Sequence, residues 1–123
     1  MNESLFELGS FQLSSGGTSS FRINAHKLTT DDWEALAHMA LSILPPFGEV
    51  VGVPTGGEAF AEALLPHTSY GPVLVVDDVL TTGNSIRKVA NDYKDSILLV
   101  AFSRMSPHPG IHAVFTLAQS PEQ

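Results

Sequence analysis

The stretch that most constrains the fold of this chain is Val73–Ser85, with the sequence VLVVDDVLTTGNS. It begins with four branched apolar residues in a row, which is typical of a strand buried on both faces. Two acids, Asp77 and Asp78, follow, and then come a loop rich in hydroxyl groups and a helix-like run, Ile86–Asn91. Because helices usually join parallel strands, this stretch predicts an α/β protein.

The rest of the chain repeats this alternation of strand and helix. Further strands are expected at 49–53, 96–102 and 111–117, and a helix is expected from about Glu58 to Leu65, where Pro66 stops it. Such alternation implies right-handed crossovers and a parallel sheet with helices on both faces. We therefore expect a single-domain α/β fold.

The first third of the chain gives a less uniform pattern. Short strands are expected at Ser10–Leu13 and Ser20–Asn24, around a turn at 14–17. Met1–Leu8 carries no clear pattern, and a short helix is one interpretation. A helix should follow with Thr30 as its N-cap, because apolar residues then recur at helical spacing until Pro45 and Pro46. These apolar residues are Trp33, Leu36, Ala37, Ala40, Leu41 and Leu44, and we expect them to face the core.

Composition limits the classes of function that fit. A chain of 123 residues with 43% hydrophobic residues can form one domain with a sizeable core. Its net charge of −7 disfavours binding to nucleic acid or to anionic membranes. The sequence has no cysteine, no membrane-length apolar run and no signal-peptide pattern, so the cytoplasm is the default expectation.

Three loops should meet at the carboxyl ends of the parallel strands, where ligands bind in such sheets. They are Pro54–Gly57, Asp77–Ser85 and Ser103–Gly110. Loop N–H groups suit a phosphate, and paired carboxylates suit ribose hydroxyls together with a hydrated Mg²⁺. The alternative is an ordinary strand–helix turn in which Asp78 or Thr82 caps the helix. That alternative accounts for one acid and one hydroxyl, but not for two acids and three hydroxyls.

Residues 73–85 resemble the 5-phosphoribosyl-1-pyrophosphate (PRPP) signature of type I phosphoribosyltransferases, and the resemblance runs from Phe11 to about Leu117. It implies an enzyme that joins a nucleobase to C1 of the ribose, inverts that centre and releases pyrophosphate. It also implies that Asp77 and Asp78 are catalytic and hold the ribose hydroxyls, with Mg²⁺ bound through PRPP and these acids. The other residues that it assigns are Thr81, Thr82, Gly83, Asn84 and Ser85 to the 5′-phosphate, and Thr55, Gly56 and Gly57 to pyrophosphate.

The N-terminal segment is similar to the base-binding segment of orotate phosphoribosyltransferases, which carries a Phe-x-Leu-x-Ser-Gly-x-x-Ser pattern. The residues that fit are Phe11, Leu13, Ser15, Gly16 and Ser19. The resemblance implies that Ser15, Phe21 and Arg104 face orotate or a similar base. It also implies a reduced N-terminal hood at 1–28, a core at 29–117 and a tail at 118–123. A plain hairpin turn and a solvated surface arginine remain the alternatives for these residues.

The chain departs from that family at one place. Orotate phosphoribosyltransferases carry a strand and a long mobile loop with cationic residues before the signature strand, whereas here Leu65 leads through PHTSYGP directly to Val73. No Lys or Arg lies between Lys27 and Arg87. Because such a loop excludes water and stabilises departing pyrophosphate, its absence leaves a second hypothesis open. That hypothesis is a noncatalytic module that binds PRPP or a nucleoside monophosphate.

Two further expectations come from the same resemblance. Members of the family are usually dimers, so a homodimer is expected. A structural subunit with a vestigial site is a third hypothesis, and the intact pair of Asp77 and Asp78 argues against it.

Overall fold

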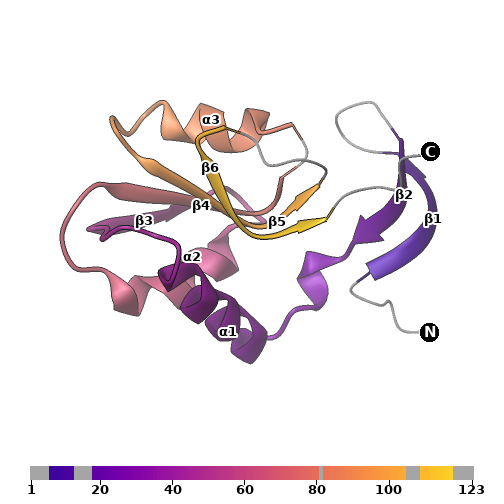
Figure 1. The fold of residues 1–123 in the computed structure, drawn as a ribbon, viewed down its shortest axis with the longest axis horizontal. Helices are drawn as coiled ribbons and strands as arrows, with labels where there is room; N and C mark the ends of the chain where they lie inside the picture. Colours follow the sequence, from indigo (N-terminus) through magenta and orange to yellow (C-terminus); the bar gives the residue numbers. More distant parts are fainter. Residues whose placement is uncertain (1–5, 13–17, 81, 105–108, 118–123) are drawn as a thin grey trace.

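A four-stranded parallel sheet forms the centre of the protein in the computed structural model, which describes residues 6–12, 18–80, 82–104 and 109–117 (Figure 1). Side chains are described from Asn24 onward. The strand order is β3-β4-β5-β6, and each neighbouring pair is parallel. The strands are β3 (Glu49–Gly52), β4 (Val73–Leu80), β5 (Ile97–Arg104) and β6 (Ile111–Leu117). The predicted α/β sheet is confirmed.

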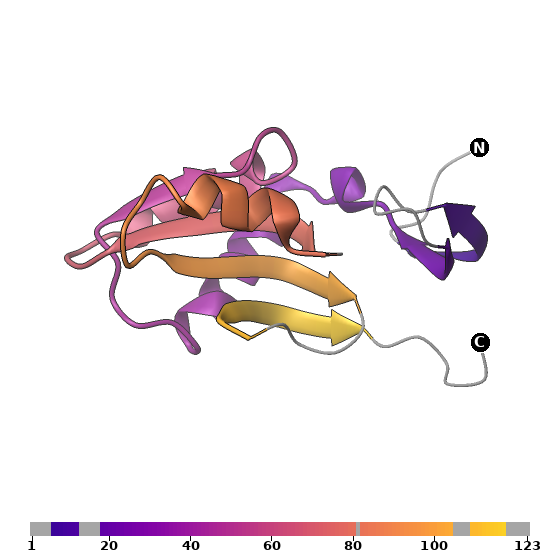
Figure 2. The same ribbon diagram turned by 90° about the horizontal axis from the view of Figure 1, so that it is seen from above.

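Helices cover both faces of this sheet (Figures 1 and 2). Helices α1 (Thr30–Leu41) and α2 (Glu58–Leu64) pack on one face, and α3 (Asn84–Ala90) packs on the other. In β4, Leu74 and Val76 belong to the cluster under α1 and α2, while Val75 belongs to the cluster under α3. This alternation explains why the first half of the strand, residues 73–76, is apolar at every position: helices cover both of its faces.

The outer strand β3 and the end of β4 differ from the expectation. Strand β3 ends at Gly52, one residue earlier than expected, and as an edge strand it is only half-buried. Strand β4 continues to Leu80, so Asp77 and Asp78 lie within the strand and not after it. The pairing explains this extension, because Val79 and Leu80 still pair with Phe102 and Ser103 of β5.

Helix α1 begins one residue earlier than expected. Its N-cap is Thr29, whose hydroxyl accepts a bond from Asp32 N at 3.2 Å while Asp32 Oδ2 accepts from Thr29 N at 2.9 Å. This capping box makes Thr30 the first helical residue and corrects its predicted role as N-cap. The helix ends at Leu41, before the prolines, so Leu44 lies outside it. Trp33, Leu36, Ala37 and Ala40 are buried, as predicted.

A hairpin of two antiparallel strands, β1 (Phe6–Gln12) and β2 (Thr18–Ile23), precedes the sheet. The short helix considered for Met1–Leu8 is therefore wrong for its described part, residues 6–8, which pair with β2. The arrowheads of β5 and β6 point toward the hairpin in both views (Figures 1 and 2). The 3-10 helix η1 (Ala25–Lys27) connects it to α1. The predicted turn at 14–17 and tail at 118–123 lie outside the described residues.

The connection between α2 and β4 is short, as expected. It consists of the 3-10 helix η2 (Leu65–His67), which contains Pro66, and of residues 68–72, which form no strand. The ring of His67 contacts that of His38 on α1, with a distance of 5.1 Å between the ring centroids. Within the described part of the chain, no helix has the length and apolar character needed to cross a membrane.

Candidate functional site

The loop Pro54–Gly57 lies against β4 at the carboxyl ends of the strands. Val53 N donates to Val76 O at 2.8 Å, which extends the contact between these two chain segments beyond β3. Gly57 N then donates to Val53 O at 2.8 Å, and this bond closes the loop before α2 begins. The peptide bond between Pro54 and Thr55 is cis. The predicted pyrophosphate loop is therefore directly beside the predicted ribose-binding strand.

Both glycines of this loop stand where a side chain would collide with β4. A Cβ atom at Gly56 would overlap the carboxylate of Asp78. A Cβ atom at Gly57 would overlap Val76 O and would stand 3.0 Å from the Cα atom of Asp77. The glycines thus allow the loop backbone to approach the two acids more closely than any other residue would.

The two acids are held by their own strand. Asp78 N donates to Asp77 Oδ1 at 2.8 Å, and Val79 N donates to Asp78 Oδ1 at 2.7 Å. Burial raises the pKa of the Asp77 carboxyl from its ordinary value of 3.8 to about 7. A side-chain hydrogen bond with Asp78 and the charge of that neighbour add to this rise, while the backbone N–H of Asp78 opposes it. Asp77 is thus poised to change its charge near neutral pH.

A pocket of about 330 Å³ opens beside Asp78 and the loop Pro54–Gly57, which we call the glycine loop. Thr55, Gly56 and Asp78 form its polar side, so three of the predicted site residues come together there. Gly57 and Asp77 are not among its lining residues. The remaining walls come from the segment between the hairpin and α1 and from the two helices, through Ala25, His26, Leu28, Trp33 and Ala59.

His26 and the apolar wall of this pocket were not predicted from the sequence. Trp33 was predicted to be a packing residue, and it is indeed buried against Phe60, with 5.2 Å between the ring centroids. It nevertheless also lines the pocket. No motif marks these residues; only the folding of the connection onto α1 brings them beside Asp78.

The loop after β4 leads into α3 through Gly83. This glycine is the N-cap of α3 with a φ of 88°, and no side chain caps the helix. Asp78 bonds to Val79 N instead, and Thr82 Oγ1 accepts from Asn84 N at 3.3 Å. Asp78 therefore does not cap the helix. Gly83 and not Thr82 is the N-cap residue, although the Thr82 hydroxyl accepts from the first N–H of the helix. Thr81 lies outside the described residues, and the side chain of Ser85 is exposed.

Of the residues predicted to face the base, only Arg104 has a side chain that the structure describes. Arg104 lies within β5 and is 6% exposed, so the solvated surface arginine is wrong. Burial lowers the pKa of its guanidinium, and the residue is not part of the pocket lining. Phe21 belongs to β2, but its side chain lies outside the described residues, as does Ser15.

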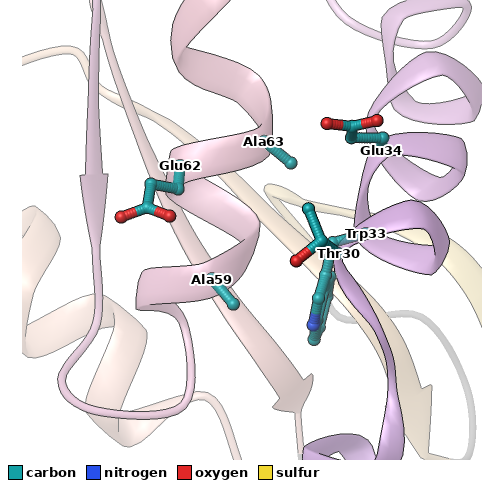
Figure 3. A pocket seen from close by; sticks show the side chains of 6 residues that line it. All are labelled: Thr30, Trp33, Glu34, Ala59, Glu62 and Ala63. Carbon is teal, nitrogen blue, oxygen red and sulfur yellow. The ribbon is translucent and has the colours of Figure 1, made fainter.

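A second, smaller pocket of about 130 Å³ lies between α1 and α2 (Figure 3). It shares Trp33 and Ala59 with the larger pocket. Ala59 and Ala63 point toward α1, whereas the carboxylate of Glu62 points away from it (Figure 3). The two pockets therefore lie next to each other, on either side of Trp33 and Ala59.

Asp77 and Asp78 are also the residues of this site that could bind a metal ion. The described residues contain no group of three or more His, Asp or Glu side chains arranged to hold a metal. Asp77 and Asp78 offer two carboxylates, which suits Mg²⁺ carried mainly by substrate oxygens and water. They do not form a cage that would hold the ion by itself.

Comparisons with solved structures identify the fold. The sequence matches no protein-family model and no curated protein significantly. An orotate phosphoribosyltransferase from Aeropyrum pernix has a TM-score of 0.71 and 27% identity, over 91% of this chain and 88% of that one. A Mycobacterium tuberculosis H37Rv orotate phosphoribosyltransferase in complex with inorganic phosphate has a TM-score of 0.64 and 18% identity, over 89% and 87%.

A third similar structure is the UMP synthase of Leishmania donovani, with a TM-score of 0.75 and 18% identity. The match covers 92% of this chain but 34% of that protein, so the chain spans about a third of its length. The protein therefore has the type I phosphoribosyltransferase fold, in the form seen in orotate phosphoribosyltransferases.

Proposed function

We propose that this protein binds PRPP and transfers its phosphoribosyl group to a nucleobase, with release of pyrophosphate. One observation carries the proposal: the glycine loop meets the carboxylate of Asp78 at the mouth of a pocket of about 330 Å³, at the carboxyl ends of the strands. Ligands of open parallel sheets bind at this edge. The similarity to orotate phosphoribosyltransferases supports the same location.

Each part of PRPP has a proposed partner in the chain. Asp77 and Asp78 accept hydrogen bonds from the ribose hydroxyls, and the loop after β4 surrounds the 5′-phosphate. The loop after β3 meets the pyrophosphate with its backbone, which the glycines leave without side chains in the way. The residues assigned are Thr81, Thr82, Gly83, Asn84 and Ser85 for the 5′-phosphate, and Thr55, Gly56 and Gly57 for pyrophosphate.

The acceptor is proposed to be orotate or a similar planar base. The pocket beside Asp78 provides the buried ring of Trp33 and the aliphatic side chains of Ala25 and Leu28 near the sugar site. A flat ring suits such an apolar wall. Ser15, Phe21 and Arg104 remain proposed base contacts on the strength of the resemblance.

Mg²⁺ is the proposed cofactor. The two adjacent carboxylates fit an ion that keeps most of its shell from PRPP and water. When bound, the ion neutralises charge on the diphosphate. The carboxylates themselves orient the ribose, and their negative charge lies beside the carbon on which positive charge develops.

A noncatalytic PRPP- or nucleotide-binding module is the second candidate. The observation that favours it is the connection from α2 to β4, which passes through η2 and residues 68–72 without a strand. That connection carries neither Lys nor Arg. A site without a closing cationic loop lacks donors worth about 10²–10³-fold in rate for each one lost.

Pyrophosphate release from Mg·PRPP, measured with a panel of nucleobases that includes orotate, separates the two candidates. A transferase releases pyrophosphate only with its own base, and the Asp77→Ala/Asp78→Ala variant does not. The matched control is Glu49→Ala/Asp92→Ala, which removes two exposed acids away from the site. If the wild-type protein releases no more than the Asp77→Ala/Asp78→Ala variant, the transferase proposal fails.

We also propose that the protein is a homodimer. Sedimentation equilibrium gives the mass directly. Twice the chain mass of 13.1 kDa supports the proposal, and a monomer at all concentrations contradicts it.

A further inference from the structure

The guanidinium of Arg87 bridges the loop after β4 and the segment that leads into β6. Arg87 lies in α3, and its Nη1 donates to Thr82 O at 3.4 Å. Its Nη2 donates to Pro109 O, also at 3.4 Å, in the connection between β5 and β6. These bonds are long but come from the two ends of one rigid fork. One side chain thus joins the loop after β4 to the residues that precede β6.

The backbone beneath the guanidinium has a shape that leaves room for it. Gly83 has a φ of 88°, a conformation that side chains disfavour, and it is buried. A Cβ atom at Gly83 would overlap Arg87 Nη1 and stand 3.2 Å from its Cζ atom. The glycine therefore serves two purposes: it turns the chain into α3, and it allows the guanidinium to lie directly on the loop.

A positive charge such as that of Arg87 is rare in this acidic protein. The protein carries a net charge of −7, and the 59 residues from Leu28 to Ile86 contain no Lys or Arg. Among the described cations of the sheet's carboxyl edge, Arg104 is buried within β5. Arg87 is exposed, and its hydrogen bonds to Thr82 O and Pro109 O use two of the five donors of a guanidinium.

We propose that Arg87 is the positioning residue of the phosphate loop: it fixes the loop around Thr82 and Gly83 and places a positive charge beside the bound 5′-phosphate. This inference rests on the proposed function, since it presumes that this loop receives the phosphate of PRPP. It adds a residue that the family signature did not assign. It also gives an acidic protein a way to hold an anionic substrate at this loop.

The test uses the full chain and three ligands: ribose 5-phosphate, pyrophosphate and PRPP. Calorimetry with Mg²⁺ compares the wild type with Arg87→Met, Arg87→Lys and the control Lys88→Met, which removes one charge from the adjacent exposed position of α3. Arg87→Met should lower the affinity for ribose 5-phosphate and for PRPP by about tenfold or more, because a charge-assisted contact and the loop geometry are both lost. Pyrophosphate should bind the variant within about twofold of the wild type, since this ligand uses the loop after β3.

The other variants separate position from charge. Arg87→Lys keeps the positive charge but loses the planar, two-pronged guanidinium. Its affinity for ribose 5-phosphate and PRPP should therefore lie between that of the wild type and that of Arg87→Met. Its retained charge also makes it the variant to rely on if Arg87→Met does not fold. Lys88→Met should bind all three ligands like the wild type.

Four outcomes would overturn the inference. Equal affinity of wild type, Arg87→Met and Arg87→Lys for ribose 5-phosphate would show that Arg87 does not act on the loop. Equal losses for pyrophosphate and ribose 5-phosphate would indicate a general structural effect, and an equal loss in Lys88→Met would indicate net charge. If the wild type binds neither PRPP nor ribose 5-phosphate, the proposed function fails and the inference falls with it.

Discussion

At the scale of single residues, Asp77 is the group whose environment most affects the behaviour of the protein. Its carboxyl is partly buried next to a second carboxyl, and its pKa rises to about 7. Keeping this acid in a place where its charge is disfavoured costs stability at neutral pH. Such a cost is understandable at a site that must bind ribose hydroxyls and Mg²⁺, because those ligands stabilise the charged form.

The raised pKa predicts that the ligand-free protein becomes less stable as the pH rises. Between pH 4 and 7 the folded Asp77 keeps a proton that the unfolded chain has released, so unfolding becomes more favourable with each pH unit up to about 7. Asp77→Asn should be more stable than the wild type at pH 8 and closer to it at pH 5. Thermal unfolding of both proteins from pH 5 to 8, without Mg²⁺, measures this difference. Parallel curves for the two proteins would refute it.

Binding of PRPP should follow the opposite trend. The ionised carboxylate of Asp77 is the form that accepts hydrogen bonds, so affinity for Mg·PRPP should rise as the pH passes about 7. Asp77→Asn should bind weakly at every pH and lose this dependence. Calorimetry at pH 6, 7 and 8 measures it, with Asp92→Asn as the control for removing an exposed acid. A wild-type affinity that stays constant or falls over this range would contradict the assignment.

At the scale of elements, the loop between β3 and α2 owes its shape to two glycines with different neighbours. The atoms that a Cβ would meet at Gly56 belong to a side chain, the Asp78 carboxylate, which can move aside. Those at Gly57 belong to the backbone of Val53, Val76 and Asp77, which cannot. The same substitution should therefore affect function at one position and folding at the other.

Gly56→Ala is predicted to displace the Asp78 carboxylate and to weaken PRPP binding by about tenfold or more, with little change in stability. Gly57→Ala is predicted to destabilise the fold by about 1–3 kcal/mol, because the loop must separate from β4. Urea unfolding and PRPP titration of both variants measure the two effects. Equal stability loss in both, or normal PRPP binding by Gly56→Ala, would contradict this distinction.

The start of α1 offers a test of the capping box. Thr29→Ala should cost about 1 kcal/mol of stability, because the bond from Asp32 N is lost. Thr30→Ala should be close to neutral, since Thr30 is exposed and lies inside the helix. Urea unfolding compares them. A larger loss for Thr30→Ala would restore the assignment made from the sequence.

At the scale of the whole molecule, apolar patterning predicted the sheet and its helices because burial on both faces leaves a clear signal. The alternation in β4 and the stripe of α1 are examples. The residues at which the strands begin and end were less predictable. Strand β4 extends through Asp77 and Asp78 because the residues after them still pair with β5, and no local sequence pattern indicates that pairing. The edge position of β3 likewise depends on what lies beside it in the sheet.

The residues of the candidate site that belong to a local sequence motif could be predicted. Asp78, Thr55 and Gly56 come together as the order of loops at a parallel sheet predicts. His26 and Leu28 were missed, because their place in the pocket depends on how the connection after the hairpin folds. The burial of Arg104 was missed for a related reason: β5 extends further than its apolar run indicates, and Arg104 pairs with Leu117 of β6.

We propose above all that the carboxyl edge of β3 and β4 binds PRPP, and calorimetric titration of PRPP in the presence of Mg²⁺ is the decisive experiment. We predict saturable binding of one PRPP per chain by the wild type and by Glu49→Ala/Asp92→Ala, and loss of binding in Asp77→Ala/Asp78→Ala. Absence of PRPP binding by a folded wild-type protein, or equal binding by the Asp77→Ala/Asp78→Ala variant, would contradict the claim.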